Sequence, residues 1–399
     1  MNRNFSKKRE NTNILLVGAG AVGSILANLL YNKKGINLKI ADREFKTNSL
    51  KIKKTRLLKV DISKIEKMKK ISVGSDIIIN ASLPNFNELI MKTAITVKAN
   101  YQDMCSLLAD LKEPEQLKYH DKFRKVGITG LINTGISPGI TNLLAKHMSS
   151  KFAKVNNVKI RTLEHQDSSR FIPMWSVKTT LDELLSAPLI YKRKNFIIVK
   201  PFQDPEIYRF PKKYGYQKVY TIYGDEVATI PKFIDLRQID YKAGGHDIEY
   251  FYNFFKKNVK KNLNKAKHSS TRARLEKIIG RIPSGDELGV LIKDQVLRNG
   301  FFLAVVEMNG FDQNQKRARA RYYIEPPELI KISRVSPGYN YISYPTALAA
   351  MAFLMNFDNV KKPGVFPPES LDFSVVNSII KGIKEMGIKI GIYQFTNRQ

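Results

Sequence analysis

The sequence predicts an α/β fold: a Rossmann doubly wound parallel sheet joined to a second α+β domain with a mixed or antiparallel sheet. Over the first 140 residues, short apolar runs alternate with helix-spaced segments, the pattern of parallel strands connected by crossover helices. A glycine-rich turn at 18–23 joins the first apolar run to the first helical segment. Beyond about residue 150 that regularity ends, and runs of alternating polar and apolar residues begin, as in antiparallel sheets.

Each predicted element of the first domain is a short apolar or helix-spaced run bounded by polar or turn-forming residues. The predicted strands lie at Ile14–Val17, Leu38–Ala41, Leu57–Val60, Ile77–Asn80, Asn100–Asp103 and Ile128–Ile132. The predicted helices lie between them at Val22–Asn32, Phe86–Val97 and Pro114–Val126. We expect the carboxyl ends of these strands to meet at one edge of the sheet, because parallel strands run in the same direction.

The second half of the chain is predicted to be β-rich, with helices at its end. Strands are predicted at Val158–Thr162 and Lys218–Ile222, and a hairpin is predicted from Phe301–Met308 and Arg319–Ile324. Helices are predicted at Lys260–Ile279, Ala347–Phe357 and Val375–Met386.

The composition favours a cytoplasmic, globular protein that is not inserted in a membrane. With 399 residues, 43% of them hydrophobic, the chain is long enough for two or three domains. Its single cysteine, Cys105, permits no intrachain disulfide, which favours a reducing compartment. Basic residues precede the apolar run Ile14–Leu30 as in a signal peptide, but the glycine-rich turn inside that run fits a fold better. The apolar stretch Ala347–Met355 is far shorter than a membrane span.

The chain is strongly basic, with a formal net charge of +31 from 67 Lys and Arg residues against 36 Asp and Glu residues. The excess is densest between Lys256 and Arg281, where ten basic residues accompany one acid, Glu276. Such a segment could bind nucleic acid or an anionic membrane, or it could be a solvated helix in a protein from a lysine-rich proteome. No RNA-binding aromatic pattern or helix-turn-helix spacing accompanies it, so we do not expect nucleic acid as a partner.

The glycine-rich turn has the spacing G-x-G-x-x-G of a dinucleotide site. Gly18 is expected to form the tight turn, Gly20 to admit the pyrophosphate to the backbone, and Gly23 to let the helix pack on the strand. The helix that begins at Ala21 and Val22 would offer amide donors and positive partial charge to the phosphates. The alternative, a glycine-rich turn without a ligand, fits less well with a strand before it and a helix after it.

Residues at the ends of the next strands are expected to contact the cofactor. Asp42 lies nineteen residues after Gly23, where an acid would bind the ribose hydroxyls of NAD. Arg43 and Lys46 follow it and could accept the additional phosphate of NADP, so NAD is only slightly favoured. Further contacts are expected from Asp61 after the third strand, on the adenine side, and from the loop 80–84 after the fourth strand, which begins with Asn80 and Ala81 and should line the nicotinamide half of the cofactor. For Asp61, a helix N-cap is the alternative.

Several segments together resemble the saccharopine dehydrogenase-like family of NAD(P)-dependent oxidoreductases, which includes saccharopine reductase, lysine 6-dehydrogenase and carboxynorspermidine synthase relatives. The resemblance covers most of the chain, loosely in its second half and hardly at all over 250–300. The segments that carry it are V-G-A-G-A-V-G (17–23), A-D-R (41–43), D-I-I-I-N-A (76–81), N-Y-Q-D-M (100–104), G-I-S-P-G-I-T-N-L-L-A (135–145) and M-W-S-V-K (174–178).

The resemblance implies a domain organisation and a reaction. A Rossmann domain at 1–140 would be completed by C-terminal helices at 334–399, with a substrate and dimerisation domain inserted at 141–333 and a basic helical segment near 255–282. The reaction would transfer hydride between the nicotinamide and a carbon bonded to nitrogen. We therefore expect an NAD(P)-dependent oxidoreductase that acts on a CH–NH or CH–NH2 group of an amino-acid or polyamine-like substrate, and we expect a homodimer.

Such a reaction needs a group that moves a proton near the nitrogen and a cation that binds a substrate carboxylate. Tyr101 and Asp103 follow the same predicted sheet edge as Asn80, so we expect them to position the substrate and move protons, although Asp103 could be a turn acid. Lys178 corresponds to an Arg that the resemblance assigns to a substrate carboxylate; Lys keeps the charge and loses the bidentate geometry. The nearby Trp175 could equally be a core residue.

The loop that carries Ser137 is expected to border the active site. In saccharopine- and carboxynorspermidine-forming relatives this position is typically an Asp assigned to the chemistry. A serine hydroxyl needs an activating partner to act as a base, so we expect Asp103 to supply the missing carboxylate.

Other polar residues of the second domain are weaker candidates. Asp225 and Glu226 could receive an amine or be solvated turn acids. His165 and His246 could act as an acid or base, although a lone histidine is more often structural. The five histidines are scattered and have no metal-binding spacing, so we expect no metal.

Two other functions remain open at this point. One is a non-catalytic nucleotide-binding or scaffold protein that uses its basic surface on anionic partners. The other is an oxidoreductase of the same family that acts on a different carbonyl or on a carbon–carbon double bond.

Overall fold

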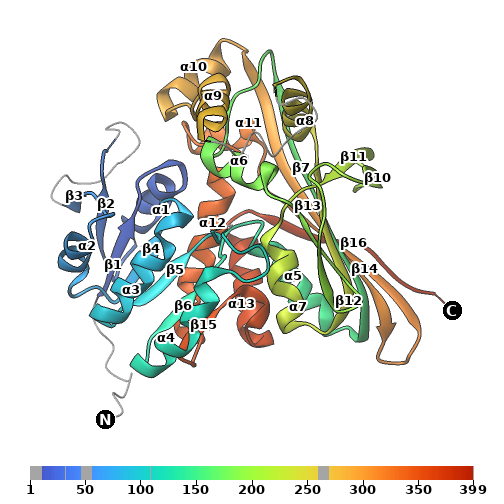
Figure 1. Ribbon diagram of the computed structural model, residues 1–399, viewed down its shortest axis with the longest axis horizontal. Coiled ribbons are helices and arrows are strands. Elements are labelled where there is room, and N and C mark those ends of the chain that lie inside the picture. The colour runs from blue at the N-terminus through green and yellow to red at the C-terminus, as the bar shows by residue number, and fades with distance from the viewer. Residues whose placement is uncertain (1–10, 32, 46–55, 108, 259–268, 399) are drawn as a thin grey trace.

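A computed structural model describes residues 11–31, 33–45, 56–107, 109–258 and 269–398. Its strands form two large sheets, one built from the N-terminal part of the chain and one from the central part (Figure 1). The C-terminal helices α12 (Ser343–Met355) and α13 (Phe373–Glu385) lie between the sheets and pack on each other and on helices of the N-terminal half. The predicted α/β fold class is confirmed.

The first sheet is entirely parallel, with the strand order β15-β6-β5-β4-β1-β2-β3. The chain leaves β1 for β2 on one side and returns to β4 on the other, which opens a crevice at the carboxyl ends of β1 and β4. All six predicted strands are present, and a seventh, β15, comes from the C-terminal part. The bounds are β1 Thr12–Val17, β2 Ile36–Asp42, β3 Leu57–Lys59, β4 Ile77–Asn80, β5 Asn100–Asp103, β6 Thr129–Leu131 and β15 Gly364–Phe366.

Helices cover both faces of the first sheet because alternate residues of its central strands point to opposite sides. Leu16 and Ile79 belong to the core shared with α1 (Ala21–Tyr31) and α12. Leu15 and Ile78 belong to the core of the opposite face. The helices of that face are α2 (Ile65–Ser72), α3 (Asn87–Val97) and α4 (His120–Val126). The predicted helix Pro114–Val126 differs in one respect: its first part, Glu115–Tyr119, is a 3-10 turn.

The second sheet is mixed, with the order β10-β11-β12-β7-β13-β14-β16. The pair β12–β7 is parallel and the other pairs are antiparallel, including the predicted hairpin β13–β14. The hairpin β8–β9 attaches to β12. The bounds are β7 Phe152–Ser168, β8 Leu189–Lys192, β9 Asn195–Ile198, β10 Glu206–Arg209, β11 Tyr216–Thr221, β12 Leu236–Gly244, β13 Leu297–Asp312, β14 Arg317–Glu325 and β16 Lys389–Arg398. The final strand thus joins the second sheet, while β15 joins the first.

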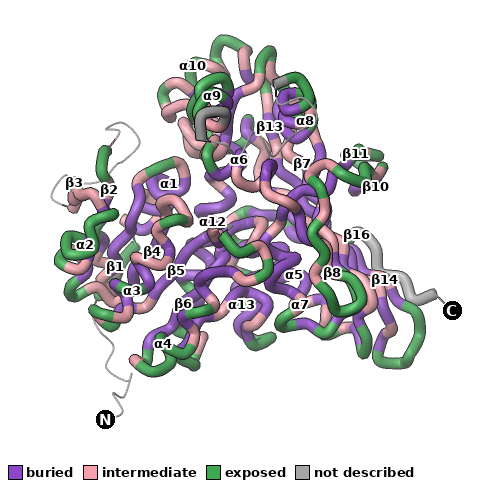
Figure 2. The backbone as a smooth tube through the Cα atoms, viewed as in Figure 1, coloured by how far each residue is buried: buried purple, intermediate pink, exposed green. Residues whose placement is uncertain are grey.

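The remaining helices surround the second sheet. Two of them, α5 (Ile140–Ser149) and α7 (Asp225–Phe233), lie between the sheets and are buried along most of their length (Figure 2). The predicted helix Lys260–Ile279 is seen as α9 (Ser269–Ile279), and residues 259–268 lie outside the described part. The others are α6 (Val177–Leu185), α8 (His246–Asn258), α10 (Gly285–Lys293) and α11 (Leu329–Val335). None of the described helices is long and apolar enough to cross a membrane.

Candidate active site

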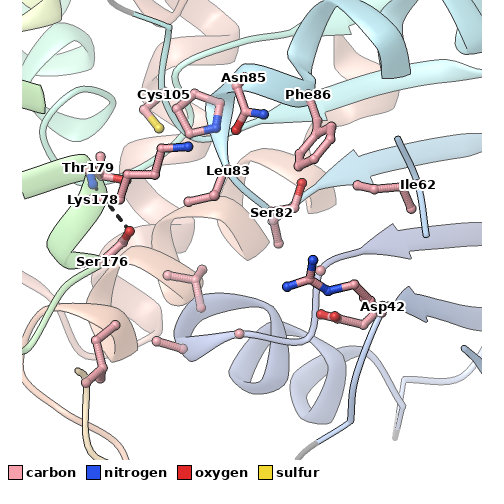
Figure 3. A pocket seen from close by; sticks show the side chains of 18 of the residues that line it. Asp42, Ile62, Ser82, Leu83, Asn85, Phe86, Cys105, Ser176, Lys178 and Thr179 are labelled. Atoms are coloured by element: carbon pink, nitrogen blue, oxygen red, sulfur yellow. Dashed lines mark hydrogen bonds between the residues drawn. The ribbon is translucent and has the colours of Figure 1, made fainter. Parts of the chain in front are cut away.

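A cavity of about 460 Å³ opens at the carboxyl edge of the first sheet (Figure 3). One wall is formed by the glycine-rich turn and the residues that follow β2, and another by the loop after β4. Residues at the start of α6, from the second half of the chain, close the far end together with Cys105. The cavity therefore joins a nucleotide-type crevice to side chains of the second domain.

The glycine-rich turn needs its glycines for two different reasons. Gly18 has φ +100°, and a Cβ there would lie 2.7 Å from the carbonyl oxygen of Ala81; a Cβ on Gly23 would lie 2.0 Å from the carbonyl oxygen of Gly18. Both contacts are too short for any side chain, so these two glycines are fixed by packing. Gly20 lines the cavity, and a Cβ there would meet nothing within 4 Å. The open space in front of Gly20 fits the approach of a pyrophosphate.

Asp42 is held against the glycine-rich turn. Its Oδ2 accepts a hydrogen bond of 2.5 Å from the Ala19 amide, and its Oδ1 accepts one of 3.1 Å from the Glu44 amide. Both Asp42 and Arg43 line the cavity. A carboxylate and a guanidinium thus flank the point where the ribose of a bound dinucleotide would lie.

Asp61 lines the cavity and also shapes the turn before α2. Its Oδ1 accepts hydrogen bonds from the hydroxyl and the amide of Ser63, at 2.7 and 3.1 Å. The hydrogen bond from the Ser63 hydroxyl is the main reason that the pKa of Asp61 is lowered. The N-cap of α2 is Lys64, so Asp61 does not cap the helix. Asp61 instead stabilises the turn that leads into it.

Asn80 shapes the loop after β4 instead of lining the cavity. Its amide group donates to Asn87 Oδ1 at 2.7 Å, and its Oδ1 accepts from the amide and the hydroxyl of Ser82. The cavity is lined by the loop that Asn80 orders, from Ala81 to Phe86. The loop 80–84 was expected at this place because it directly follows a strand of the parallel sheet. The lining extends two residues further, to Asn85 and Phe86.

The start of α6 brings a cation to the far end of the cavity. Lys178 is exposed and points toward the loop that carries Asn85 (Figure 3). Arg272 of α9 fixes this helix, because it donates to the Lys178 carbonyl at 2.8 Å and to Asp182 at 2.5 Å. Trp175, the single tryptophan of the chain, also lines the cavity.

Asp103 and Tyr101 lie behind the cavity wall and are not among its lining residues. Asp103 is buried and accepts hydrogen bonds from the Asn133 amide (2.8 Å), the Tyr101 hydroxyl (2.8 Å) and Gln116 (3.2 Å). Burial raises the pKa of Asp103 to about 7, although these hydrogen bonds oppose the change. Burial also raises the pKa of Tyr101. The proton-transfer role of this pair stays a prediction.

Ser137 has a carboxyl partner, Glu226, that was not expected from the sequence. Its hydroxyl donates to Glu226 Oε1 at 2.6 Å, and its oxygen lies 3.3 Å from the Tyr241 hydroxyl. Thr141 donates to the same Glu226 oxygen at 2.6 Å. Burial raises the pKa of Glu226, while the two hydroxyl donors oppose that change.

Further carboxyl groups lie near Glu226: Asp225 is buried, whereas Glu183 and Glu164 are partly buried. Asp225 accepts from the amide of Ser106, the residue after Cys105, at 3.1 Å, and burial raises the pKa of Asp225 to about 8. Burial also raises the pKa of Glu183 and, to about 8, that of Glu164. A nearby cation would favour the charged form of these groups and so oppose the shifts.

The two histidine candidates lie together at a different cavity. The ring centroids of His165 and His246 are 6.0 Å apart, and the ring of His165 stacks on that of Phe301. His165 lines a separate cavity of about 360 Å³ that also contacts Lys213 and Glu328. Burial lowers the pKa of His165, whereas the Asp247 side chain raises that of His246. The structure does not bring them to the nucleotide-type cavity.

Two family models match the chain along most of its length. Residues 14–131 match the saccharopine dehydrogenase NADP binding domain, and residues 135–388 match the saccharopine dehydrogenase C-terminal domain.

Named relatives match more loosely. The chain is 26% identical over 269 residues to the carboxynorspermidine synthase of Vibrio cholerae, a match that covers 61% of this chain and 64% of the relative. It is 25% identical over 147 residues to the carboxyaminopropylagmatine dehydrogenase of Synechocystis, covering 34% and 37% of the two chains. The match therefore spans less than two thirds of the length of these relatives. Each relative is named as an enzyme, so neither supports the alternative of a non-catalytic scaffold.

Two solved structures share the fold across nearly the whole chain. Saccharopine dehydrogenase (L-Glu forming) from Saccharomyces cerevisiae superposes with a TM-score of 0.68 at 15% identity, covering 96% of this chain and all of the other. The homospermidine synthase of Legionella pneumophila, solved in complex with NAD, gives a TM-score of 0.71 at 15% identity, covering 96% and 91%.

Proposed function

The chain belongs to the saccharopine dehydrogenase family, and from that premise we propose that it is an NAD(P)-dependent oxidoreductase that transfers hydride at a C–N bond of an amino-acid or polyamine-type substrate. One observation carries the proposal. A single cavity runs from the glycine-rich turn to Lys178 and Cys105, and buried carboxyl groups lie just beyond Cys105. A dinucleotide and a substrate with an amine could be brought together in that arrangement.

The residues around the cavity fit a nicotinamide dinucleotide, which supplies or accepts the hydride when it is bound. The open face at Gly20 and the N-terminus of α1 would hold the pyrophosphate, since free amides there donate to anions. Asp42 would accept hydrogen bonds from the adenosine ribose, which supports a slight preference for NAD. Arg43 lines the same wall and could accept the additional phosphate of NADP. The remaining cofactor contacts would come from residues that line the cavity: Gly18, Ala21, Val22, Asp61 and Ala81. Gly23 and Asn80 would act indirectly, by shaping the glycine-rich turn and the loop after β4.

The substrate would lie between Lys178 and the buried carboxyl groups. Lys178 would bind a substrate carboxylate at the far end of the cavity. Asp225 and Glu183 would face a substrate amine, because a cation lowers the cost of ionising them. The names of the relatives, carboxynorspermidine synthase and carboxyaminopropylagmatine dehydrogenase, agree with a substrate that has both groups.

We also propose a cytoplasmic homodimer built through the inserted domain at 141–333. Support comes from exposed apolar side chains on its outer strands, Ile207 on β10 and Tyr216 on β11, which are 65% and 68% exposed. Light scattering of the purified protein tests the dimer, and a monomer at micromolar concentration would contradict it.

The function can be tested in two stages. Emission of Trp175, which lines the cavity, should change when NAD(H) or NADP(H) is titrated into the protein. The protein should then reduce NAD⁺ or NADP⁺ when given carboxynorspermidine, carboxyaminopropylagmatine or saccharopine, as measured by the absorbance of the reduced nicotinamide. Absence of cofactor binding would overturn the proposal at the first stage, and binding without turnover on any C–N substrate would restore the scaffold alternative.

A further inference from the structure

One carboxyl oxygen of Glu226 accepts hydrogen bonds from two hydroxyl groups. Ser137, in the loop after β6, and Thr141, in the first turn of α5, both donate to Glu226 Oε1 at 2.6 Å. Glu226 itself lies in the first turn of α7. Three segments of the chain therefore place one carboxyl oxygen between two hydroxyl groups.

Ser137 is the accessible member of this group. Glu226 is 1% exposed and Thr141 is fully buried, whereas Ser137 is partly exposed. On the other side of Ser137, the Tyr241 hydroxyl lies 3.3 Å from its oxygen and 3.2 Å from Thr162. Of the two hydroxyl groups bonded to Glu226, that of Ser137 is the one on a partly exposed residue, so it is the one that a molecule in the site could reach.

Neither Ser137 nor Glu226 lines the cavity, but contacts through Cys105 and its neighbour connect the group to the substrate end. Cys105 lines that end, and the amide of the next residue, Ser106, donates to Asp225, which directly precedes Glu226. This bond docks the start of α7 against the loop after β5. Ser137 follows β6, the neighbour of β5 in the first sheet, so it emerges at the same edge as Cys105.

We propose that Glu226 stores the proton of the reaction and exchanges it with the substrate nitrogen through the Ser137 hydroxyl. The inference rests on the proposed function. In the oxidative direction an ammonium N–H bond breaks and its proton goes to Ser137 Oγ, while the original Ser137 proton goes to the Glu226 carboxylate. One proton moves and no electron moves: ammonium and carboxylate become neutral amine and carboxylic acid. The neutral amine has the lone pair that hydride loss from the adjacent carbon requires. The reductive direction reverses these transfers.

The Glu226 carboxyl group supplies the carboxyl function that is absent at position 137. An Asp there would place a carboxylate directly at the site, and here Ser137 stands in its place with the Glu226 carboxyl group immediately behind it. Asp103, the candidate favoured by the sequence, is instead bonded to Tyr101, Gln116 and Asn133, and none of these hydrogen bonds involves Ser137. The contacts therefore favour Glu226.

The surroundings of Glu226 raise its pKa above the ordinary value of a glutamic acid. Burial disfavours the charged form of Glu226, and the hydroxyls of Ser137 and Thr141 partly offset that cost. The titratable groups that surround it on the packed elements are Asp225 on α7, Glu183 on α6, Tyr241 on β12 and Glu369 after β15. Because a general acid or base works best when its pKa is near the working pH, a raised pKa favours the role.

The test uses Glu226→Gln in the full-length protein with carboxynorspermidine and NAD⁺ or NADP⁺, over a range of pH. Oxidation needs the Glu226 carboxylate, so the kcat of the wild type should fall as pH falls; we call this decrease the acidic limb of the pH profile. In Glu226→Gln the acidic limb should be absent. The kcat of this variant at neutral pH should be at least about 100-fold below that of the wild type. Glu369→Gln is the matched control: Glu369 is an equally buried carboxyl group, bonded to Asn142, without a bond to Ser137. It should keep the acidic limb.

A swapped variant separates proton transfer from a structural role. Ser137→Asp combined with Glu226→Ser moves the carboxyl group to the exposed side of the same bond, and it should recover kcat to within about tenfold of wild type. Its acidic limb should move to lower pH, since the acid would be less buried. Infrared spectra of the cofactor-free protein should also lose one titrating carboxyl band in Glu226→Gln, and Trp175 emission should show unchanged cofactor affinity in every variant.

The outcomes distinguish this inference from the function on which it rests. An active wild-type protein whose Glu226→Gln variant keeps both its kcat and its acidic limb would overturn the inference and leave the function standing. An active wild type with a folded, cofactor-binding but inactive swapped variant would assign Glu226 a structural role. A wild-type protein that binds the cofactor and turns over no C–N substrate would overturn the function first.

Discussion

The hydroxyl of Ser137 and the carboxyl group of Glu226 are 2.6 Å apart, although 89 residues separate them in the chain. Ser137 follows a strand of the first sheet, and Glu226 starts the helix α7 that packs on the second sheet. Their bond therefore joins the two halves of the molecule at the place where the substrate would meet the cofactor.

Gly20→Ala should weaken cofactor binding without unfolding the protein. A Cβ at Gly20 meets no protein atom within 4 Å and would project into the space proposed for the pyrophosphate. We expect affinity for NAD(H) and NADP(H) to fall by about tenfold or more, about 1.4 kcal/mol. Trp175 emission measures the affinity, and an unchanged value would place the pyrophosphate elsewhere.

Gly23→Ala should lower the stability of the protein, unlike Gly20→Ala. Its Cβ would lie 2.0 Å from the Gly18 carbonyl oxygen, so α1 would have to move away from β1. We expect the free energy of unfolding to fall by about 1–3 kcal/mol, as for overpacked cores. Thermal unfolding followed by circular dichroism checks this, with Gly20→Ala as the control that keeps the wild-type Tm.

Lys178→Ala should raise KM for substrates that have a carboxylate. The side chain lines the cavity, and a charge-assisted hydrogen bond contributes about 1.5–3 kcal/mol, which corresponds to about a tenfold to hundredfold effect. Lys178→Arg should retain most of the wild-type value because it keeps the charge. Steady-state kinetics with carboxynorspermidine distinguish the two variants. Equal KM values for all three proteins would remove Lys178 from the substrate site.

The protein should be less stable at pH 8 than at pH 5.5. Burial raises the pKa of Asp103 and Glu369 to about 7 in the folded state, above the values of about 4 expected when unfolded. The folded state therefore binds more protons, and the stability that each group contributes is lost as pH rises toward its folded pKa. In Asp103→Asn, the free energy of unfolding should decrease less steeply with pH, by up to about 1.4 kcal/mol per pH unit. A Tm that rises from pH 5.5 to pH 8 would contradict these protonation states.

Glu307→Ala should destabilise the second sheet without affecting cofactor binding. Glu307 is 3% exposed and accepts hydrogen bonds from Arg319, Arg321 and the Tyr208 hydroxyl. Burial alone would raise its pKa, and the two arginines outweigh burial and lower the pKa to about 2. Removal of one partner from a buried ion pair costs about 3–5 kcal/mol. Urea unfolding measures the change, and a loss below about 1 kcal/mol would show that Arg319 and Arg321 find other partners.

The first sheet could be predicted from the sequence because its signals are local. Each strand is a short apolar run, and turns and helix starts separate the runs, as at Gly18–Gly23 after β1. The second sheet was only partly predicted. Its longest strand, β7, includes Glu164, His165 and Asp167, and its helix α7 contains Pro231, so neither has the usual pattern of its class.

The candidate site shows the same division. Residues that follow the strands of the first sheet were found, because topology places such residues at one edge. The loop 80–84 was expected there for the same reason, and the cavity lining continues to Asn85 and Phe86. The bond between Ser137 and Glu226 had no local signal, since no periodicity or spacing relates two residues that are brought together only by the packing of α5 against α7.

The most direct test of the proposed function follows the hydride itself. The protein would be mixed with NAD⁺ or NADP⁺ and a carboxynorspermidine that has deuterium on the carbons bonded to its secondary nitrogen, and the reduced nicotinamide would be analysed by mass spectrometry. Transfer at a C–N bond predicts one deuterium on the nicotinamide ring and slower turnover than with the unlabelled compound. Reduced nicotinamide without deuterium would show that the hydride comes from another bond and would contradict the account.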